Sequence, residues 1–407
     1  MKVTSLETTI VSVPYRNRET SSRVRRDGVT DVLVKIGTDT GLVGWGEGCS
    51  GADVVSVEAA VKAMAPMVIG RDPWAREAIA DDVFTTGLWD YRPMTGNFAF
   101  SGIDMALWDL CGKDCRQPLY NLFGGLRRES VDYFCYLSIG NPEDVAAQCR
   151  AGLERGYTVF YVKVGIDFQA EFEMVKAIRR TIGPDCKIRV DANGRWSVNE
   201  ALRNLAELDA FRIDFAEQPV PAEPVRNMAE LRARTPVALC SNEGLGRVSD
   251  CWEVIRSRAA DVLCFSSTWV GSLAHFARLS HAAHLEGIKV CKHTHGELGI
   301  AAAAHQHVLL TLPNIVDGHQ QTASIMADDV LAEPLPIADG PTWGVPLGEG
   351  LGIRVDEDKV RKYHEHYRAH GQFLPYQQQA GIRALGRLSM VSFIRPPNHL
   401  ERNLNVT

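Results

Sequence analysis

The chain has 407 residues, of which 45% are hydrophobic and 23% are charged, so it can bury a large core divided over more than one domain. Its net charge of −6 gives no basic footprint for nucleic acid, and no apolar run has the length of a membrane span. The N-terminus lacks a signal-peptide pattern, and the ten cysteines are scattered without a C-x-x-C pair. These features favour a cytoplasmic protein with reduced thiols and argue against a zinc or disulfide framework.

The first 50 residues or so predict antiparallel strands, at 10–13 and 32–36, on either side of a polar loop at 15–28. This loop carries five arginines, among them Arg25. Two interpretations are open. The loop is either solvated and mobile, or it is a lid whose arginines bind an anionic substrate, because guanidinium pairs bidentately with carboxylate. Residues 52–125 then show helical patterns.

From residue 131 the pattern alternates between strands and helices. The strand patterns lie at 131–137, 159–164, 188–191, 213–217, 237–241, 262–265, 289–292 and 314–317, the last being the weakest. Eight strands at this spacing predict an α/β fold with a closed parallel barrel, whose catalytic groups sit at the C-terminal ends of the strands. From about residue 335 the sequence becomes turn-rich, and 372–407 is polar and moderately basic, either packed on a neighbour or disordered.

Three of the predicted strands end in an acid, at Asp191, Glu217 and Glu243, and successive acids are 26 residues apart. Consecutive parallel strands place their C-terminal ends at one rim, so the three carboxylates should converge. Any one acid at a strand end is more often a helix cap or a solvated loop residue. Three at equal spacing would repel one another, and a Mg²⁺ ion, which prefers hard oxygen ligands, resolves that repulsion. The sequence therefore predicts one divalent cation per subunit.

Groups that could move a proton lie on the second and seventh strands. Tyr161 and Lys163 are two residues apart and should both face the barrel mouth. Near a divalent cation the pKa of Lys163 is expected to fall, which suits a general base, although a lysine that only bridges the carboxylates is the alternative. His293 should lie across the barrel from Lys163, so that a bound carbon could be approached on both faces. His295 is expected to bind substrate or to support His293.

Other polar residues at the barrel mouth are candidates for binding the substrate. Asp317 and His319 follow the eighth strand and could bond the substrate or a developing oxyanion. Trp269 either lines the pocket or belongs to the core. The remaining candidates for substrate contact are Asn193, Ser266 and Arg25.

With these residues, the chain resembles the enolase superfamily, in the branch of mandelate racemase, muconate lactonizing enzyme and the acid-sugar dehydratases. The resemblance covers roughly residues 1–370. It rests on the runs Asp191-Ala-Asn193, Glu217-Gln-Pro219 and Asn242-Glu243, and on the signature at 102–109 and 118–125.

The resemblance implies a modified TIM (β/α)7β barrel at 129–335, under an α+β capping domain at 1–128. The segment 336–407 would return to the cap and end in a tail. By resemblance, Asp191, Glu217 and Glu243 match the Mg²⁺ ligands, Lys163 the base for one face of the α-carbon, and His293 the histidine of the other face. Dimers or octamers are implied by the same likeness.

Two departures from the family pattern matter. Tyr161 replaces the first lysine of a Lys-x-Lys pair, and Ser266 stands where the racemase branch has an Asp that supports the histidine. Without that Asp, His293 should be a weaker base that could still act as a general acid.

The expected reaction is therefore Mg²⁺-dependent removal of the proton α to a carboxylate. Dehydration of a hydroxy or sugar acid to a 2-keto acid is the preferred outcome. The alternatives are a racemase or epimerase of an α-substituted carboxylate, and a homologue that binds a metal or ligand without catalysis. The substrate's identity and stereochemistry do not follow from the sequence.

Overall fold

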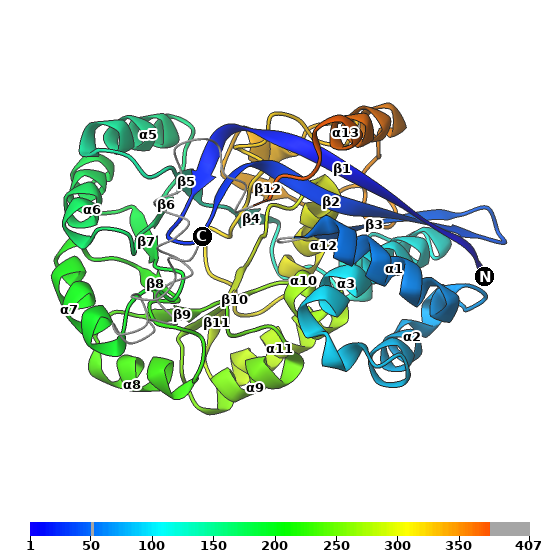
Figure 1. The fold of residues 1–407 in the computed structure, drawn as a ribbon, viewed down its shortest axis with the longest axis horizontal. Coiled ribbons are helices and arrows are strands. Elements are labelled where there is room, and N and C mark those ends of the chain that lie inside the picture. The colour runs from blue at the N-terminus through cyan, green and yellow to red at the C-terminus, as the bar shows by residue number, and fades with distance from the viewer. Residues whose placement is uncertain (50–52, 375–407) are drawn as a thin grey trace, which may run out of the picture.

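The computed structural model describes residues 1–49 and 53–374, and it divides into a strand-and-helix cap beside a barrel (Figure 1). The cap begins with an antiparallel sheet in the order β1 (Val3–Thr20), β2 (Arg25–Thr38) and β3 (Val43–Cys49). Its helices are α1 (Val54–Val68), α2 (Arg76–Asp81), α3 (Pro93–Asp114) and α4 (Leu119–Leu122). Apolar side chains of β2, such as Val32 and Ile36, pack with those of α1 and α3 into a core of their own.

A seven-stranded parallel sheet forms the barrel, in the order β11-β10-β9-β8-β7-β6-β5. The strands are β5 (Cys135–Leu137), β6 (Val159–Lys163), β7 (Lys187–Asp191), β8 (Phe215–Glu217), β9 (Leu239–Ser241), β10 (Val262–Phe265) and β11 (Lys289–Lys292). A short ribbon of β4 (Ser130–Asp132) and β12 (Thr342–Gly344) lies outside this sheet. The parallel barrel is the fold class that the sequence predicts.

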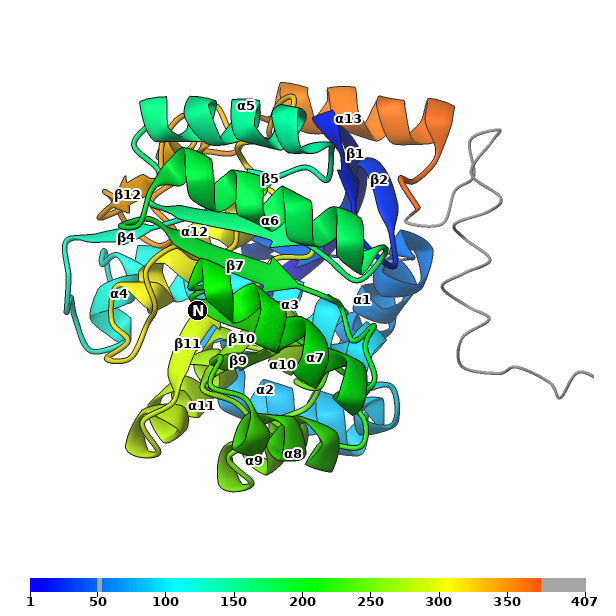
Figure 2. The same cartoon turned by 90° about the vertical axis from the view of Figure 1, so that its left-hand side faces the viewer.

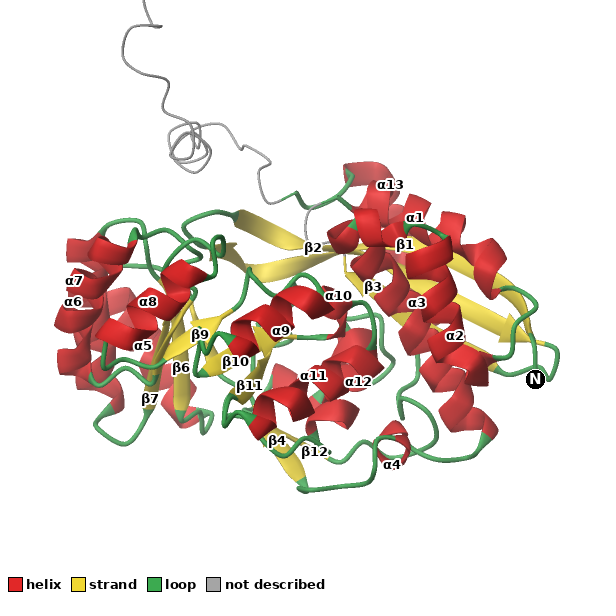
Figure 3. Ribbon diagram, turned by 90° about the horizontal axis from the view of Figure 1, so that it is seen from below, coloured by secondary structure: helices red, strands yellow, loops and turns green. Residues whose placement is uncertain are grey.

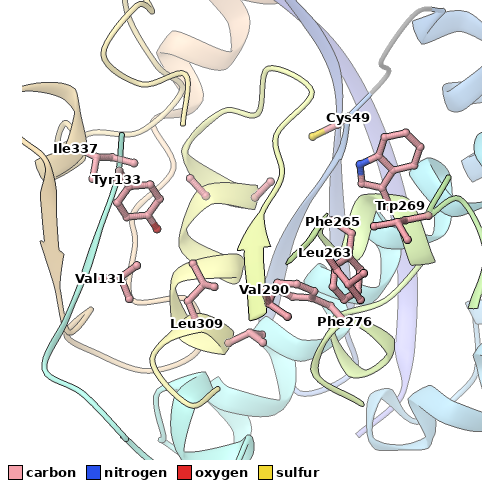
Figure 4. Close-up of a cluster of buried hydrophobic side chains, with 14 of the residues drawn as sticks. Cys49, Val131, Tyr133, Leu263, Phe265, Trp269, Phe276, Val290, Leu309 and Ile337 are labelled. Carbon is pink, nitrogen blue, oxygen red and sulfur yellow. The ribbon is translucent and has the colours of Figure 1, made fainter. Parts of the chain in front are cut away.

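Helices surround the barrel strands on their outer side (Figures 2 and 3). They are α5 (Pro142–Glu154), α6 (Phe168–Ile182), α7 (Val198–Leu208), α8 (Arg226–Arg234), α9 (Val248–Arg256), α10 (Ser267–Val270), α11 (Leu273–Leu285) and α12 (Gly299–Leu309). Several begin at a side chain that accepts hydrogen bonds from the first free backbone amides, as Asn141, Asp167 and Ser197 do for α5, α6 and α7. The buried layer between strands and helices includes Leu263, Phe265, Phe276 and Val290 (Figure 4).

The predicted eighth strand is not a strand in the described structure. Residues 314–317 contact β11 through one isolated bridge, Val290 with Ile315, and a second bridge joins Tyr133 to His319. These two bridges lie on either side of the gap between β11 and β5, so irregular backbone closes the barrel there.

The predicted polar loop at 15–28 is mostly strand. β1 and β2 pair as far as Glu19 with Arg26 and Thr20 with Arg25, which leaves residues 21–24 as the turn. A register irregularity between Pro14 and Glu19 interrupts the alternation of apolar and polar residues. The hairpin therefore reaches over the barrel as an ordered ribbon, where the sequence suggested an unstructured loop.

The signature at 102–109 holds the cap, the barrel and the C-terminal segment together. A side chain at Gly46 would collide with the carbonyl of Gly102, so β3 packs directly on the backbone of α3. Asp104 accepts the backbone N–H of Leu273 at 2.8 Å, and Asp109 accepts that of Leu351 at 3.0 Å. Both carboxylates are buried, and each satisfies a backbone amide of another part of the chain.

Two further contacts join the cap to other parts of the chain. Glu47 on β3 accepts the backbone N–H groups of Leu298 and Ala301, at 2.7 and 3.0 Å, where α12 begins. Helix α13 (Glu357–His370) returns to the cap, and its His364 ring bonds the carbonyl of Ile10 at 2.8 Å. The division of the chain at residues 128 and 335 stays a prediction, and residues 375–407 of the expected tail lie outside the described part.

All ten cysteines are free thiols, as the scattered positions predict. Within residues 1–49 and 53–374, none of the helices combines the length and the apolar character that a membrane crossing requires.

A buried histidine on α12 makes the stability of the fold depend on pH. The His307 ring donates to the carbonyl of Leu351 at 3.1 Å, and burial lowers its pKa to about 4. In the unfolded chain this ring takes up a proton as the pH falls through about 6.5, while in the fold it stays neutral until about 4. We expect it to make the protein about 2 kcal/mol less stable at pH 5 than at pH 7.5.

Urea unfolding of the native chain and of His307→Gln at both pH values measures this contribution. The variant should lose part of the pH dependence, and the exposed His281→Gln should keep all of it. An unchanged pH dependence in His307→Gln would contradict the assignment.

Candidate functional site

Three carboxylates stand at the ends of three neighbouring strands. Asp191 ends β7 and Glu217 ends β8, and these two residues are register partners. Glu243 follows two residues after the end of β9. Asp191 and Glu217 are fully buried and Glu243 is partly buried. The structure thus brings together the three acids that the sequence spacing selects.

Neutral and cationic donors surround these acids. Lys163 Nζ and Tyr161 Oη both donate to Asp191 Oδ2, at 2.6 and 2.5 Å. Asn193 Nδ2 bridges Asp191 Oδ2 and Glu243 Oε1, at 3.2 and 3.0 Å. Each acid is therefore tied to a neighbour at the rim of the barrel.

Glu217 has a partner that no sequence pattern indicated. Gln320 Nε2 donates to both oxygens of Glu217, at 2.8 and 3.0 Å. Gln320 directly follows His319, where the irregular backbone closes the barrel, so strand alternation could not have given its direction.

Burial and mutual repulsion raise the pKa of two of these carboxyl groups. Burial, followed by the charge of Asp191, raises the pKa of Glu217 well above its ordinary value and also raises that of Glu243. Burial lowers the pKa of Lys163, but the charges of Asp191 and Glu217 outweigh it, so the pKa is raised. The depressed pKa that the sequence predicts for Lys163 applies to a site that holds a cation, and it stays a prediction; without a cation the lysine bonds directly to Asp191.

The site has the character that a divalent cation requires. Oε2 of Glu243 and Oδ1 of Asn193 are buried oxygens without a hydrogen-bond partner among the described residues. Hard oxygen donors with concentrated negative charge fit Mg²⁺. The described sets whose ligand atoms all lie within 4.8 Å are Glu217 with Cys240 and Cys264, and Asp31 with Glu47 and Cys49. The three strand-end acids are spaced more widely, with the Asn193 amide between Asp191 and Glu243.

His293 directly follows β11 and lies in the same cavity as Lys163. Its Nδ1 accepts a hydrogen bond from the indole Nε1 of Trp269 at 2.8 Å. Burial, with the neighbouring His295 ring and Lys163, lowers the pKa of His293 well below its ordinary value. The ring of His295 meets that of His293 edge to face, with 4.5 Å between centroids, and the pKa of His295 is lowered by burial to about 3. Both imidazoles are therefore neutral at physiological pH.

A cavity of about 200 Å³ joins these groups. The cap hairpin covers it with Arg26, which forms an ion pair with Glu19 at 2.7 Å and donates to the carbonyl of His295 at 2.6 Å. The cavity lining includes Glu19, Arg23, Arg26, Tyr136, Tyr161, Lys163, Asn193, Glu243, Trp269, His293, His295 and Gln320. The lining combines two arginines and a lysine with carboxylates and amides, which suits a small, polar, anionic molecule.

Four of the substrate contacts expected from the sequence are wrong. Arg25 does not line the cavity, although its neighbours Val24 and Arg26 do. Ser266 is fully buried and bonds Thr268 Oγ1 at 2.8 Å. Asp317 pairs with Lys187 at 2.8 Å, at the start of β7 and hence at the opposite end of the barrel.

His319 is the fourth. It is buried against the ring of Tyr133 and accepts the backbone N–H of Lys292 at 2.8 Å, away from the cavity. The irregular closure of the barrel is the reason for both misplaced residues, Asp317 and His319, since their predicted positions require a regular eighth strand.

The contributions of Glu19 and Arg26 to stability should be strongly coupled, because Glu19 is only 8% exposed and Arg26 neutralises its charge. Arg26→Met leaves a buried carboxylate unpaired, and we expect a loss of about 3–5 kcal/mol in the free energy of unfolding. The double variant Glu19→Met/Arg26→Met should recover more than half of that loss. Urea unfolding of the three proteins measures it, and a double variant as unstable as the single one would refute the coupling.

Comparisons with known proteins agree with this geometry. The mandelate racemase / muconate lactonizing enzyme N-terminal domain model matches residues 5–124, and the enolase C-terminal domain-like model matches residues 144–359. The chain is 30% identical to an N-succinyl-L-Arg/Lys racemase of Bacillus cereus over 380 residues, which covers 89% of this chain and 98% of the relative. It is 27% identical to an arabinonate dehydratase of Saccharolobus solfataricus, covering 82% and 90%.

A solved structure is similar over the whole fold. The muconate lactonizing enzyme of Pseudomonas fluorescens, complexed with muconolactone, superimposes with a TM-score of 0.82 at 26% identity, covering 89% of this chain and 99% of that one. Two matched domain models and full-length relatives lead to one conclusion. The chain belongs to the mandelate racemase and muconate lactonizing enzyme branch of the enolase superfamily.

Proposed function

We propose that this protein is a Mg²⁺-dependent hydro-lyase that removes the proton α to a carboxylate and dehydrates a hydroxy acid, of the sugar-acid type, to a 2-keto acid. The observation that carries the proposal is the composition of the cavity. One amine, Lys163, faces it from β6, and a neutral imidazole without a carboxylate partner, His293, faces it from beyond β11.

Asp191, Glu217 and Glu243 are the residues that would hold the cation. A bound Mg²⁺ supplies Lewis-acid stabilisation of the negative charge that develops on the substrate carboxylate. Asn193 and Gln320 hold the oxygens of these acids in place through their amide groups. Lys163 is fixed by Asp191 so that its amine stays at the cavity wall.

The reaction balances with one base. A cation held by Asp191 and Glu217 would offset the negative charges that raise the pKa of Lys163, and the base is its neutral amine. That amine takes the α-proton, and the electron pair of the broken C–H bond passes into the carboxylate to form an enediolate. Return of that pair expels the β-hydroxyl as hydroxide, which receives a hydrogen bond from His293. Lys163 releases the α-proton to solvent, and the hydroxide takes up one proton and leaves as water. The number of protons is therefore unchanged. The enol product then becomes the 2-keto acid.

Dehydration is favoured over racemisation by the surroundings of His293. A two-base racemase needs a second group that takes up and returns a proton on the opposite face of the α-carbon. The pKa of His293 is lowered, and among the described residues no carboxylate accepts a hydrogen bond from its ring. The residue at the supporting position, Ser266, bonds Thr268 instead.

Racemisation or epimerisation is the second candidate. It is supported by the full-length likeness, at 30% identity, to a protein that is an N-succinyl-L-Arg/Lys racemase. The two candidates predict different products from the same first step, a 2-keto acid in one case and a stereoisomer in the other. A homo-oligomeric state remains a proposal drawn from the family likeness.

The metal site gives a prediction in which two effects have opposite signs. Glu243→Gln removes one of three mutually repelling charges, so without added metal the melting temperature should stay the same or rise. The rise in melting temperature that Mg²⁺ produces in the native protein should shrink, with affinity weakened at least ~10-fold, since loss of even an outer partner costs a metal site that much.

Thermal unfolding with and without Mg²⁺, together with titration calorimetry, measures both effects. The exposed Glu207→Gln is the matched control and should behave as the native protein. An unchanged Mg²⁺ effect in Glu243→Gln would remove this residue from the ligand set.

The reaction is tested with a panel of sugar acids, Mg²⁺ and semicarbazide, which traps a 2-keto product. We expect at least one substrate whose turnover falls about 10²–10⁴-fold in Lys163→Ala, the usual cost of losing a general base. His293→Asn should also reduce product formation, while Lys289→Ala, an exposed lysine at the start of β11, should not. A stereoisomer formed without any 2-keto product would replace the dehydratase proposal with the epimerase.

A further inference from the structure

We propose that Trp269 is a positioning residue that fixes His293 as the tautomer with its proton on Nε2, so that the group opposite Lys163 is a hydrogen-bond donor to substrate oxygen and not a second carbon base. The inference deepens the proposed dehydration, on which its chemical meaning rests. The tautomer itself is a property of the protein that can be measured without any substrate.

The two nitrogen atoms that meet, one from Trp269 and one from His293, determine where the imidazole carries its proton. An indole Nε1–H is a donor without a lone pair to offer, so the atom that it contacts must be an acceptor. That atom is Nδ1 of His293, at 2.8 Å. Nδ1 therefore carries no proton, and a neutral ring then carries its proton on Nε2. The charged ring and the other neutral tautomer would each place an Nδ1–H of His293 opposite the indole N–H of Trp269, where neither group could accept a hydrogen bond.

Trp269 is held in place by its burial and by its backbone contacts. It is 5% exposed and packed in the barrel core together with Phe265 and Phe276 (Figure 4). Its backbone lies in the short helix α10, where its amide donates to the carbonyl of Ser266 at 3.1 Å. Its carbonyl accepts from the side chain of Asn97 on α3 of the cap. Cap and barrel thus both hold the backbone that carries the indole.

The charged groups around the His293 ring also favour its neutral form. The groups that act on His293 are His295, Lys163, Lys292 and Arg26, and each of them disfavours a positive imidazolium. Lys292 is the residue before His293 and pairs with the buried Glu297, which in turn accepts from the His305 ring, so this carboxylate is already satisfied. Charge and hydrogen bonding, which are independent observations, agree on a neutral ring.

The proton on Nε2 of His293 is available to a molecule in the cavity. His293 lines the cavity, and its Nε2 has no hydrogen-bond partner in the described part of the chain. A donor facing the cavity can bond a β-hydroxyl as it departs or a carboxylate oxygen as it gains charge. A neutral imidazole used as a donor is an established catalytic device, as the handling of a carbonyl by such a ring in triosephosphate isomerase illustrates. It cannot take a proton from carbon at the same nitrogen.

The test is ¹⁵N-resolved NMR of full-length protein labelled in histidine and tryptophan, at pH 7 and without substrate. Signals of His293 are assigned by their loss in His293→Asn. We expect one neutral tautomer with unprotonated Nδ1, and an indole N–H resonance shifted downfield that disappears in both Trp269→Phe and His293→Asn. In Trp269→Phe the ring should lose its single form and show an increased share of Nδ1–H.

Trp252→Phe on α9, an indole that is 52% exposed, is the matched control and should leave the His293 signals unchanged. A His293 ring protonated on Nδ1 in the native protein, or unaltered in Trp269→Phe, would overturn the inference. Because this readout needs no turnover, it stands or falls apart from the dehydratase assay. Where that assay finds a substrate, kcat in Trp269→Phe should fall about tenfold with KM little changed, which corresponds to the loss of about one well-placed hydrogen bond.

Discussion

The crowding of three carboxylates at neighbouring strand ends is the constraint on which the rest of the site depends. A parallel sheet places Asp191, Glu217 and Glu243 at one rim, and burial there makes their mutual repulsion costly. The chain offsets part of this cost with the ammonium of Lys163 and the amides of Asn193 and Gln320. The same arrangement that gathers hard oxygen ligands therefore also fixes the candidate base beside them.

The cap covers part of this charged rim and completes the cavity lining. Arg26 reaches from the β1–β2 hairpin to the carbonyl of His295, and Glu47 accepts the first amides of α12 just beyond the segment that carries both histidines. Asp104 and Asp109 tie α3 of the cap to the barrel and to the C-terminal segment. Charge at the rim is thus enclosed by polar contacts from distant parts of the sequence, which keeps the geometry of the cavity dependent on both domains.

Periodicity and strand direction are the features that could be predicted from the sequence. Strand ends at equal spacing identify Asp191, Glu217 and Glu243, and alternation along β6 directs both Tyr161 and Lys163 to the same acid. The barrel itself is a consequence of the repeat of strands and helices.

Irregular backbone and contacts between distant segments could not be predicted in the same way. The missing eighth strand moves Asp317 and His319 away from the cavity and brings in Gln320, and no local pattern encodes that change. The bond from Trp269 to His293 joins the short helix α10 to the segment after β11, so its geometry appears only in the folded chain. The raised pKa of Lys163 has the same origin, because the direction of the shift depends on distances to Asp191 that the sequence does not contain.

The most direct test of a single lysine base at this rim is exchange of the substrate α-proton with deuterated solvent in the presence of Mg²⁺, followed by ¹H NMR on a panel of hydroxy acids. We predict exchange that requires Lys163 and that leaves the configuration of recovered substrate unchanged. Exchange that persists in Lys163→Ala, or that scrambles the configuration at the α-carbon, would contradict a mechanism with Lys163 as the one carbon base.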